Sequence, residues 1–148
     1  MPINFFHLSK NISLSQRAEL KKFIQFLFKK EQKPFSNLNY IFCSDKYLLE
    51  INRTYLNHNY LTDIITFNLS DDPEIITGEI YISIDRVREN AAILGLSIRE
   101  EIHRVIFHGA LHLCGFGDKT KPQKLLMKIK EDTYLDMYLG VNDSRGTV

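Results

Sequence analysis

The chain has 148 residues, of which 44% are hydrophobic and 25% are charged, and its formal net charge at pH 7 is +1. A chain of this length and composition is expected to form one globular domain that buries a core without disulfide or metal staples. It contains no apolar run of membrane-spanning length, and its N-terminus lacks the pattern of a signal peptide. We therefore expect a single domain over residues 1–148, located in the cytoplasm and without a membrane partner.

The distribution of charge is less even than the total. Residues 1–60 hold nine Lys or Arg against four Asp or Glu, residues 61–118 hold four against ten, and residues 119–148 hold six against four. Basic flanks around an acidic middle could guide a phosphate backbone, although ordinary solvated helix faces explain the same counts and are favoured from charge alone. The two cysteines, Cys43 and Cys114, form no C-x-x-C pair, which favours buried thiols in a reducing compartment.

The first third of the chain predicts a strand, a helix and a second strand. Residues 2–8 carry closely spaced Ile and Phe, as a strand does. Ser13 and Gln16 form a capping box for a helix that ends in a lysine-rich stretch before Pro34. Residues 38–42 alternate between apolar and polar side chains, which predicts a second strand. The long connection favours parallel pairing of the two strands.

Shorter elements follow in the middle of the chain. Asp45 is expected to cap a helix that runs to about residue 56, with Leu48, Ile51 and Tyr55 facing inward. Two further strands, at residues 63–69 and 78–84, are expected to form a hairpin.

Helices are predicted for the rest of the chain. One runs over residues 85–94 and is ended by Gly95. The last one, over residues 121–139, is opened by Thr-Lys-Pro-Gln and ended by Gly140, with residues 141–148 as a frayed tail. The expected fold class is α+β, a mixed sheet of about four strands packed with about five helices.

The most informative stretch is residues 107–118, at the end of a further predicted helix. Ser97 and Glu100 form a capping box that opens this helix, and Gly115 ends it. Gly117 allows a second sharp turn, after which the chain can fold back toward the end of the helix. The residues that follow are expected to form a metal site, which would lie at the end of this central helix.

Three potential metal ligands lie in this stretch, in the pattern H-x-x-x-H-x-x-G-x-x-D. His108 and His112 are four residues apart and therefore share one helix face, and Asp118 can reach them from the turn. Three protein ligands with one open position are the arrangement of a catalytic zinc, so we expect one Zn²⁺ per chain. A closed structural zinc would need a fourth ligand, and Cys114 points to nearly the opposite side of the helix. Two histidines and one carboxylate could also hold Fe(II), which nothing else in the chain supports.

The spacing matches the metzincin zinc motif with two substitutions. Gly109 replaces the Glu that acts as general base in those peptidases, and Asp118 replaces the third His. A metallopeptidase is therefore the least favoured function, and the sequence identifies no general base.

Residues 108–116 closely resemble the H-G-x-L-H-L-x-G-[YF] signature of the YbeY family, bacterial endoribonucleases involved in ribosomal RNA maturation. The family usually continues with Asp-His, where this chain has Gly117 and Asp118. The resemblance therefore makes Asp118 the third ligand, and a carboxylate there could shift metal selectivity toward harder ions.

Residues 51–67 also resemble the family, whose pattern there is Leu-Asn-x-x-Tyr-Arg-x-Lys-Asp-x-x-Thr-Asp-Val-Leu-Ser-Phe-Pro. Leu56 replaces the family's Arg, and His58 replaces its Lys. Residues 78–83 resemble the family's Gly-Asp-Ile-x-Ile-Ser strand. Residues that match the pattern or lie at its substituted positions are the candidates for substrate binding or for orienting a ligand: Asn52, Tyr55, His58 and Asp63. For Asp63 a role in bonding backbone amides at the start of the strand is equally open.

The resemblance implies a single-strand-specific, zinc-dependent endoribonuclease that acts in maturation of the 16S ribosomal RNA 3′ end and in ribosome biogenesis. Its partners would be ribosomal RNA and the small ribosomal subunit, and not DNA. A non-catalytic, metal-stabilised ribosome-assembly factor that binds RNA is the alternative, because Leu56 removes the phosphate contact that the family's Arg is thought to make.

Overall fold

The computed structural model of the chain describes residues 2–8, 14–58 and 62–140. These residues form nine elements in the following order: β1 (Ile3–His7), α1 (Arg17–Lys30), β2 (Phe35–Cys43), α2 (Asp45–Leu56), β3 (Ile64–Asn68), β4 (Ile76–Ser83), α3 (Ile84–Leu94), α4 (Ile98–Leu113) and α5 (Lys121–Leu139). The strands form one sheet in the order β1-β2-β4-β3. β1 and β4 both run parallel to β2, whereas β3 pairs antiparallel with β4. The predicted mixed sheet, parallel first pair, hairpin and α+β class are confirmed.

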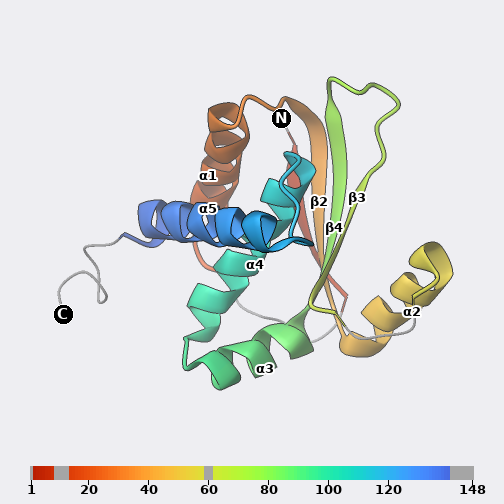
Figure 1. The fold of residues 1–148 in the computed structure, drawn as a ribbon, viewed down its shortest axis with the longest axis vertical. Coiled ribbons are helices and arrows are strands. Elements are labelled where there is room, and N and C mark those ends of the chain that lie inside the picture. Colours follow the sequence, from red (N-terminus) through yellow and green to blue (C-terminus); the bar gives the residue numbers. More distant parts are fainter. Residues whose placement is uncertain (1, 9–13, 59–61, 141–148) are drawn as a thin grey trace.

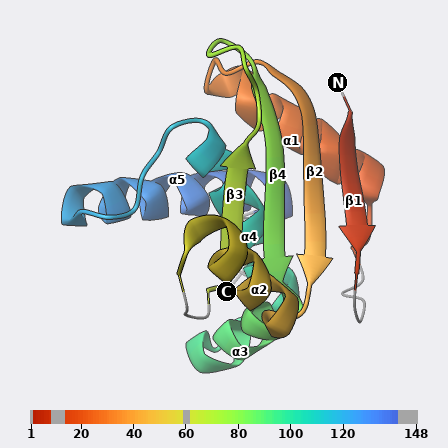
Figure 2. The ribbon, with the colours of Figure 1, turned by 90° about the vertical axis from the view of Figure 1, so that its right-hand side faces the viewer.

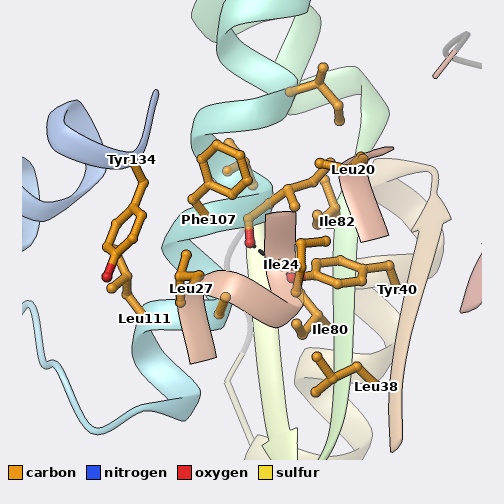
Figure 3. Packing of buried hydrophobic residues seen from close by; sticks show 14 of the residues in the cluster. Leu20, Ile24, Leu27, Leu38, Tyr40, Ile80, Ile82, Phe107, Leu111 and Tyr134 are labelled. Atoms are coloured by element: carbon orange, nitrogen blue, oxygen red, sulfur yellow. Dashed lines mark hydrogen bonds between the residues drawn. The ribbon is translucent and has the colours of Figure 1, made fainter. Parts of the chain in front are cut away.

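The helices cover the two faces of the sheet unequally. α1, α4 and α5 lie on one face, with α4 between the sheet and α5, and α2 lies alone on the other face (Figures 1 and 2). The main core fills the space between the sheet and the three-helix side, and Figure 3 shows side chains of α1, β2, β4 and α4 meeting there. A smaller cluster beneath α2 contains Cys43, Leu48 and Ile65. Burial of each aliphatic side chain stabilises the fold by roughly 1.5–3 kcal/mol. Because the main core contains more of these side chains, the three helices on that face are bound to the sheet more strongly than α2 is.

α4 approaches the sheet closely because residue 109 is glycine. A Cβ atom at Gly109 would lie 2.8 Å from Cγ2 of Ile80 and 2.9 Å from Cδ1 of Ile64. The hydroxyl of Tyr40 on β2 also donates a hydrogen bond to the backbone carbonyl of Ile106, at 3.1 Å. These contacts set the position of the C-terminal half of α4 relative to β3 and β4.

The start of α1 differs from the prediction. The helix begins at Arg17, and Gln16 before it has a left-handed backbone, with φ 56°, and makes no side-chain capping bond. Ser13 lies outside the described residues. The capping box was wrong because a helix opened at residue 13 would have to include Leu14 through Gln16, which are not helical.

The start and the inward face of α2 also differ. Its N-cap is Ser44, whose hydroxyl accepts from the amide of Tyr47 at 3.2 Å. Asp45 instead joins α2 to the β4–α3 junction, since its carboxylate accepts from the hydroxyl of Ser83 at 2.6 Å. The predicted inward position of Tyr55 was wrong, because that side of the helix is solvated and the residue is 68% exposed. The buried polar residue of this helix is Asn52.

Several local predictions hold. Gly95 ends α3 in a left-handed conformation, with φ 69°, and Thr120 and Gln123 form the capping box of α5. The thiols of Cys43 and Cys114 are free and buried, as expected for small apolar residues. No helix among the described residues is both long and apolar enough to cross a membrane. The predicted tail at residues 141–148 lies outside the described residues.

Candidate metal centre

The end of α4 turns back sharply and carries the chain across the helix face that holds the two histidines. At the other end, the hydroxyl of Ser97 accepts from the amide of Glu100 at 3.0 Å, which is the Ser97 bond of the predicted capping box. At the C-terminal end Gly115 has φ 105°, a conformation that favours glycine. The amide of Phe116 then donates to the carbonyl of Leu111 at 3.1 Å and closes the turn.

This turn brings the three predicted ligands together. Asp118 Oδ2 lies 3.4 Å from His108 Nε2 and 3.3 Å from His112 Nε2. The two imidazole rings are nearly perpendicular, with centroids 4.4 Å apart. One potential ligand atom from each of the three residues lies within 4.8 Å of the others. A single cation at the centre of this group would contact all three.

The remaining ring nitrogen of each histidine is already engaged. His112 Nδ1 lies 2.9 Å from the backbone carbonyl of Phe116. His108 Nδ1 is hydrogen-bonded to a carboxylate oxygen of Glu131 on α5. Because a carbonyl and a carboxylate can only accept, both imidazoles carry the proton on Nδ1. The lone pairs of both Nε2 atoms are therefore available to a metal ion.

The carboxylate of Glu131 is a functional feature that the sequence analysis missed. Its side chain is 7% exposed, and Arg104 Nη1 lies 3.0 Å from its other oxygen. Burial alone would raise the pKa of Glu131, but the hydrogen bond and charge of His108, together with Arg104, hold it below its ordinary value. The available signal was an acidic residue on the apolar stripe of α5, four residues after the buried Met127.

The pKa of His108 reflects the same surroundings. Burial would lower it, but the hydrogen bond and charge of Glu131 and the charges of Asp63 and Asp118 outweigh burial, so the pKa is raised. The three carboxylates thus create a negative electrostatic potential at His108, which attracts a cation.

The donor set fits a divalent metal ion. Two neutral imidazole nitrogens and one carboxylate oxygen are ordinary ligands of zinc, and the same set also suits iron and manganese. Cys114 does not extend the set, because its thiol is buried and is not among the ligand atoms that lie together. His103 is buried elsewhere on α4, where its Nδ1 lies 2.6 Å from the carbonyl of Arg99.

The group opens into a cleft of about 520 Å³ between α4 and the segment formed by α2 and β3. Of the predicted substrate-side residues, Asn52, His58 and Asp63 line this cleft. Tyr55 is not among the lining residues, since its ring packs edge-on against Phe67 with centroids 6.1 Å apart. Leu56, at the position of the family's Arg, does line the cleft.

Asp63 is placed by its backbone rather than by its side chain. Its carbonyl accepts from the amide of Ser83 at 3.0 Å, which joins the start of β3 to the end of β4. Its carboxylate acts on His108 through charge, whereas the hydrogen bond to that imidazole comes from Glu131.

A second cleft, of about 630 Å³, lies on the α5 side of the same group. Its lining includes Leu94, Arg104 and Lys128, and it shares His108 and Asp118 with the first cleft. The candidate metal centre therefore lies between two hollows of the surface.

Fold and site together define a small α+β protein with a candidate metal centre at the end of a helix packed on its sheet. This chain belongs to the YbeY family: the family model described as Endoribonuclease YbeY matches residues 4–139. Endoribonuclease YbeY of Cytophaga hutchinsonii is 47% identical over 135 residues, which cover 91% of this chain and 94% of that protein. The protein of the same name from Flavobacterium psychrophilum is 44% identical over 133 residues, covering 90% and 94%. The resemblance stated from the sequence is thereby confirmed.

The fold is similar to that of a solved structure. The solution structure of TM1509 from Thermotoga maritima matches with a TM-score of 0.67 and 26% sequence identity, over 95% of this chain and 90% of that one.

Proposed function

We propose that this protein is a zinc-dependent endoribonuclease that cleaves single-stranded RNA and acts in maturation of the 16S ribosomal RNA 3′ end. The observation that carries the proposal is the convergence of one ligand atom each from His108, His112 and Asp118 within 4.8 Å, in a chain of the YbeY endoribonuclease family. Ribosomal RNA within the small ribosomal subunit is the proposed partner, and the cytoplasm is the proposed location.

The metal ligands in this proposal are His108, His112 and Asp118. When bound, a zinc ion supplies Lewis-acid chemistry, because it draws charge from a phosphoryl oxygen and lowers the pKa of water. The protein supplies two imidazoles of fixed tautomer and a carboxylate that is 43% exposed and thus accessible from the cleft. These groups leave at least one position for substrate, as a catalytic site requires.

The cleft beside the ligands is the proposed RNA site. The exposed His58 and Lys119 line it and can contact phosphates, and Thr62 adds a hydroxyl group. Asn52 and Asp63 also line the cleft, and Asp63 contributes a negative charge. A cleft open to solvent suits an unpaired strand, whose backbone can bend to bring one phosphate to the metal.

Peptide hydrolysis is disfavoured by the packing of α4. The residue that supplies the general base of metzincin peptidases would stand at position 109. Gly109 is buried, and a Cβ atom there would meet Ile80 and Ile64 at less than 3.0 Å. A glutamate at this position would therefore collide with the sheet.

The test combines metal analysis with RNA cleavage on wild-type protein and on His112→Ala. Both proteins are loaded with zinc, desalted and assayed on a single-stranded RNA that carries the 3′ end of 16S ribosomal RNA, with circular dichroism to establish that the variant is folded. We expect one equivalent of zinc and cleavage from the wild type, and neither from the variant. Heat-treated protein and a metal-free sample control for contaminating ribonuclease.

Two results would contradict the proposal in different ways. Zinc bound at one equivalent without any cleavage would favour the metal-stabilised assembly factor, a reading supported by Leu56 in place of the family's Arg. RNA binding that survives in folded His112→Ala would strengthen that reading. A wild-type protein that binds no zinc would contradict both the zinc-dependent endoribonuclease and the metal-stabilised assembly factor.

A further inference from the structure

We propose that Glu131 is the positioning residue of the metal centre: its buried carboxylate holds His108 with Nε2 toward the metal and thereby sets the metal affinity. This inference deepens the proposed function, because it rests on zinc binding by His108, His112 and Asp118. Glu131 itself touches neither metal nor substrate, and it acts through the imidazole of His108.

The first support is the contact between α4 and α5. A carboxylate oxygen of Glu131 accepts from His108 Nδ1–H across the interface of the two helices, 23 residues apart in the chain. Metal-ligating histidines are commonly held in this way, since a carboxylate on one nitrogen fixes the ring and makes the other nitrogen a stronger donor. The described part of the chain thus supplies the partner that a ligand histidine needs.

The second support is the burial of the charged carboxylate of Glu131 together with compensating charges. An unpaired buried carboxylate is strongly destabilising, so such a group persists where its charge is compensated. Arg104 provides the compensation, with Nη1 at 3.0 Å from Glu131 and Nε at 2.8 Å from Glu101. Glu101 is fully buried. The result is a chain of charged groups that runs from Glu101 through Arg104 and Glu131 to His108.

The third support is the difference between the two histidines. His112 is held by the carbonyl of Phe116, a local contact within the turn that ends α4. His108 is held by a full negative charge from another helix. Its hydrogen bond therefore depends on a side chain that can be changed without altering the turn that delivers Asp118.

Glu31 provides a matched control. Its carboxylate is also a largely buried partner of α5: it accepts from Lys130 Nζ at 3.1 Å and from the hydroxyl of Tyr134. The side chain is 10% exposed. Glu31 follows α1, and none of its hydrogen bonds is to one of the three ligands, so Glu31→Gln removes a comparable charge beside α5 without touching the metal centre.

The experiment measures the zinc affinity of wild type, Glu131→Gln and Glu31→Gln by competition with a chromogenic chelator. We expect Glu131→Gln to bind zinc about 10- to 100-fold more weakly, as loss of a carboxylate partner of a ligand histidine does. Glu31→Gln is expected to match the wild type in zinc affinity even where its melting temperature falls. Glu131→Asp, which keeps the charge, should recover part of the affinity.

A second measurement needs no variant. Long-range ¹H–¹⁵N spectra of the zinc-loaded wild type should place the proton of His108 on Nδ1. Equal zinc affinity in wild type and folded Glu131→Gln, or a His108 proton on Nε2, would overturn the role of Glu131 and leave the proposed function standing. Absence of zinc binding in the wild type would overturn the proposed function itself, and the role of Glu131 with it.

Discussion

The two sides of the cleft are built differently. The helical wall consists of α4 and the turn that follows it, with His108, His112 and Asp118 facing the cleft. Each of its two histidines has one nitrogen engaged, by a backbone carbonyl or by a buried carboxylate of α5. The strand wall consists of Asn52, Leu56 and His58, in α2 and just after it, and of residues 62–66, which include the start of β3. Leu56 and His58 are exposed on it. Chemistry needs fixed geometry, whereas recognition tolerates change on an exposed surface. The departures from the family pattern at positions 56 and 58 lie on the strand wall and change the type of side chain, whereas Asp118 on the helical wall replaces the family's His with another metal-ligating residue.

Loss of the acidic ligand should have the largest effect on the helical wall. We expect Asp118→Ala to weaken zinc binding by more than the roughly 10- to 100-fold that follows loss of a hydrogen-bonding partner. Chelator competition measures this. Asp118→His, which introduces the residue usual in the family, should retain one equivalent and favour zinc over manganese more strongly than the wild type does. Unchanged zinc binding by Asp118→Ala would remove Asp118 from the ligand set.

Adding one methyl group at the back of the helical wall should cost stability. We expect Gly109→Ala to lower the free energy of unfolding by about 1–3 kcal/mol, because its Cβ would overlap Ile80 and Ile64. Chemical denaturation measures the change. Ile64→Val, which removes the methyl that Gly109 faces at 2.9 Å, should reduce the penalty in the double variant. A penalty that is independent of Ile64 would contradict the close approach of α4 to β3.

The strand wall should accept a new charge without loss of stability. We expect Leu56→Arg to bind single-stranded RNA more tightly, with a salt dependence steeper by about 0.7 in log–log slope if the guanidinium contacts one phosphate. Binding is measured by fluorescence anisotropy in metal-free protein at several salt concentrations. Ile93→Arg, at a 72% exposed position on α3 that lines neither cleft, controls for total charge. An equal gain from both variants would assign the effect to net charge alone.

The smallest effect is expected at Tyr55, which lies on α2 beside the strand wall but does not line the cleft. Its ring is exposed and packs edge-on against Phe67. Tyr55→Ala should lower the free energy of unfolding by about 1 kcal/mol or less, whereas deletion of a buried aromatic ring costs about 3–5 kcal/mol. Thermal denaturation distinguishes the two. A loss of several kcal/mol would mean that the ring is packed, as the helical periodicity of α2 predicts.

Much of the fold could be predicted because its signals are local. The α5 capping box, the glycine after α3 and the alternation of Leu38, Tyr40 and Phe42 each act over a few residues, and all are found as expected. The errors lie where several local choices compete. Ser44 and Asp45 are both good caps, and the choice between them depended on Ser83 and Arg86, which hold Asp45 from another part of the chain.

The sequence by itself determined the three candidate ligands, because His108, His112 and Asp118 lie within eleven consecutive residues whose geometry follows from helix periodicity and one glycine turn. Only the tertiary structure decided what surrounds them. Glu131 reaches His108 because α5 packs across α4, and residue 109 must be small because α4 lies against Ile80. Neither contact has a short-range signature, since each depends on how separate elements pack together. Helix geometry thus specifies the ligands, and packing specifies how firmly they are held.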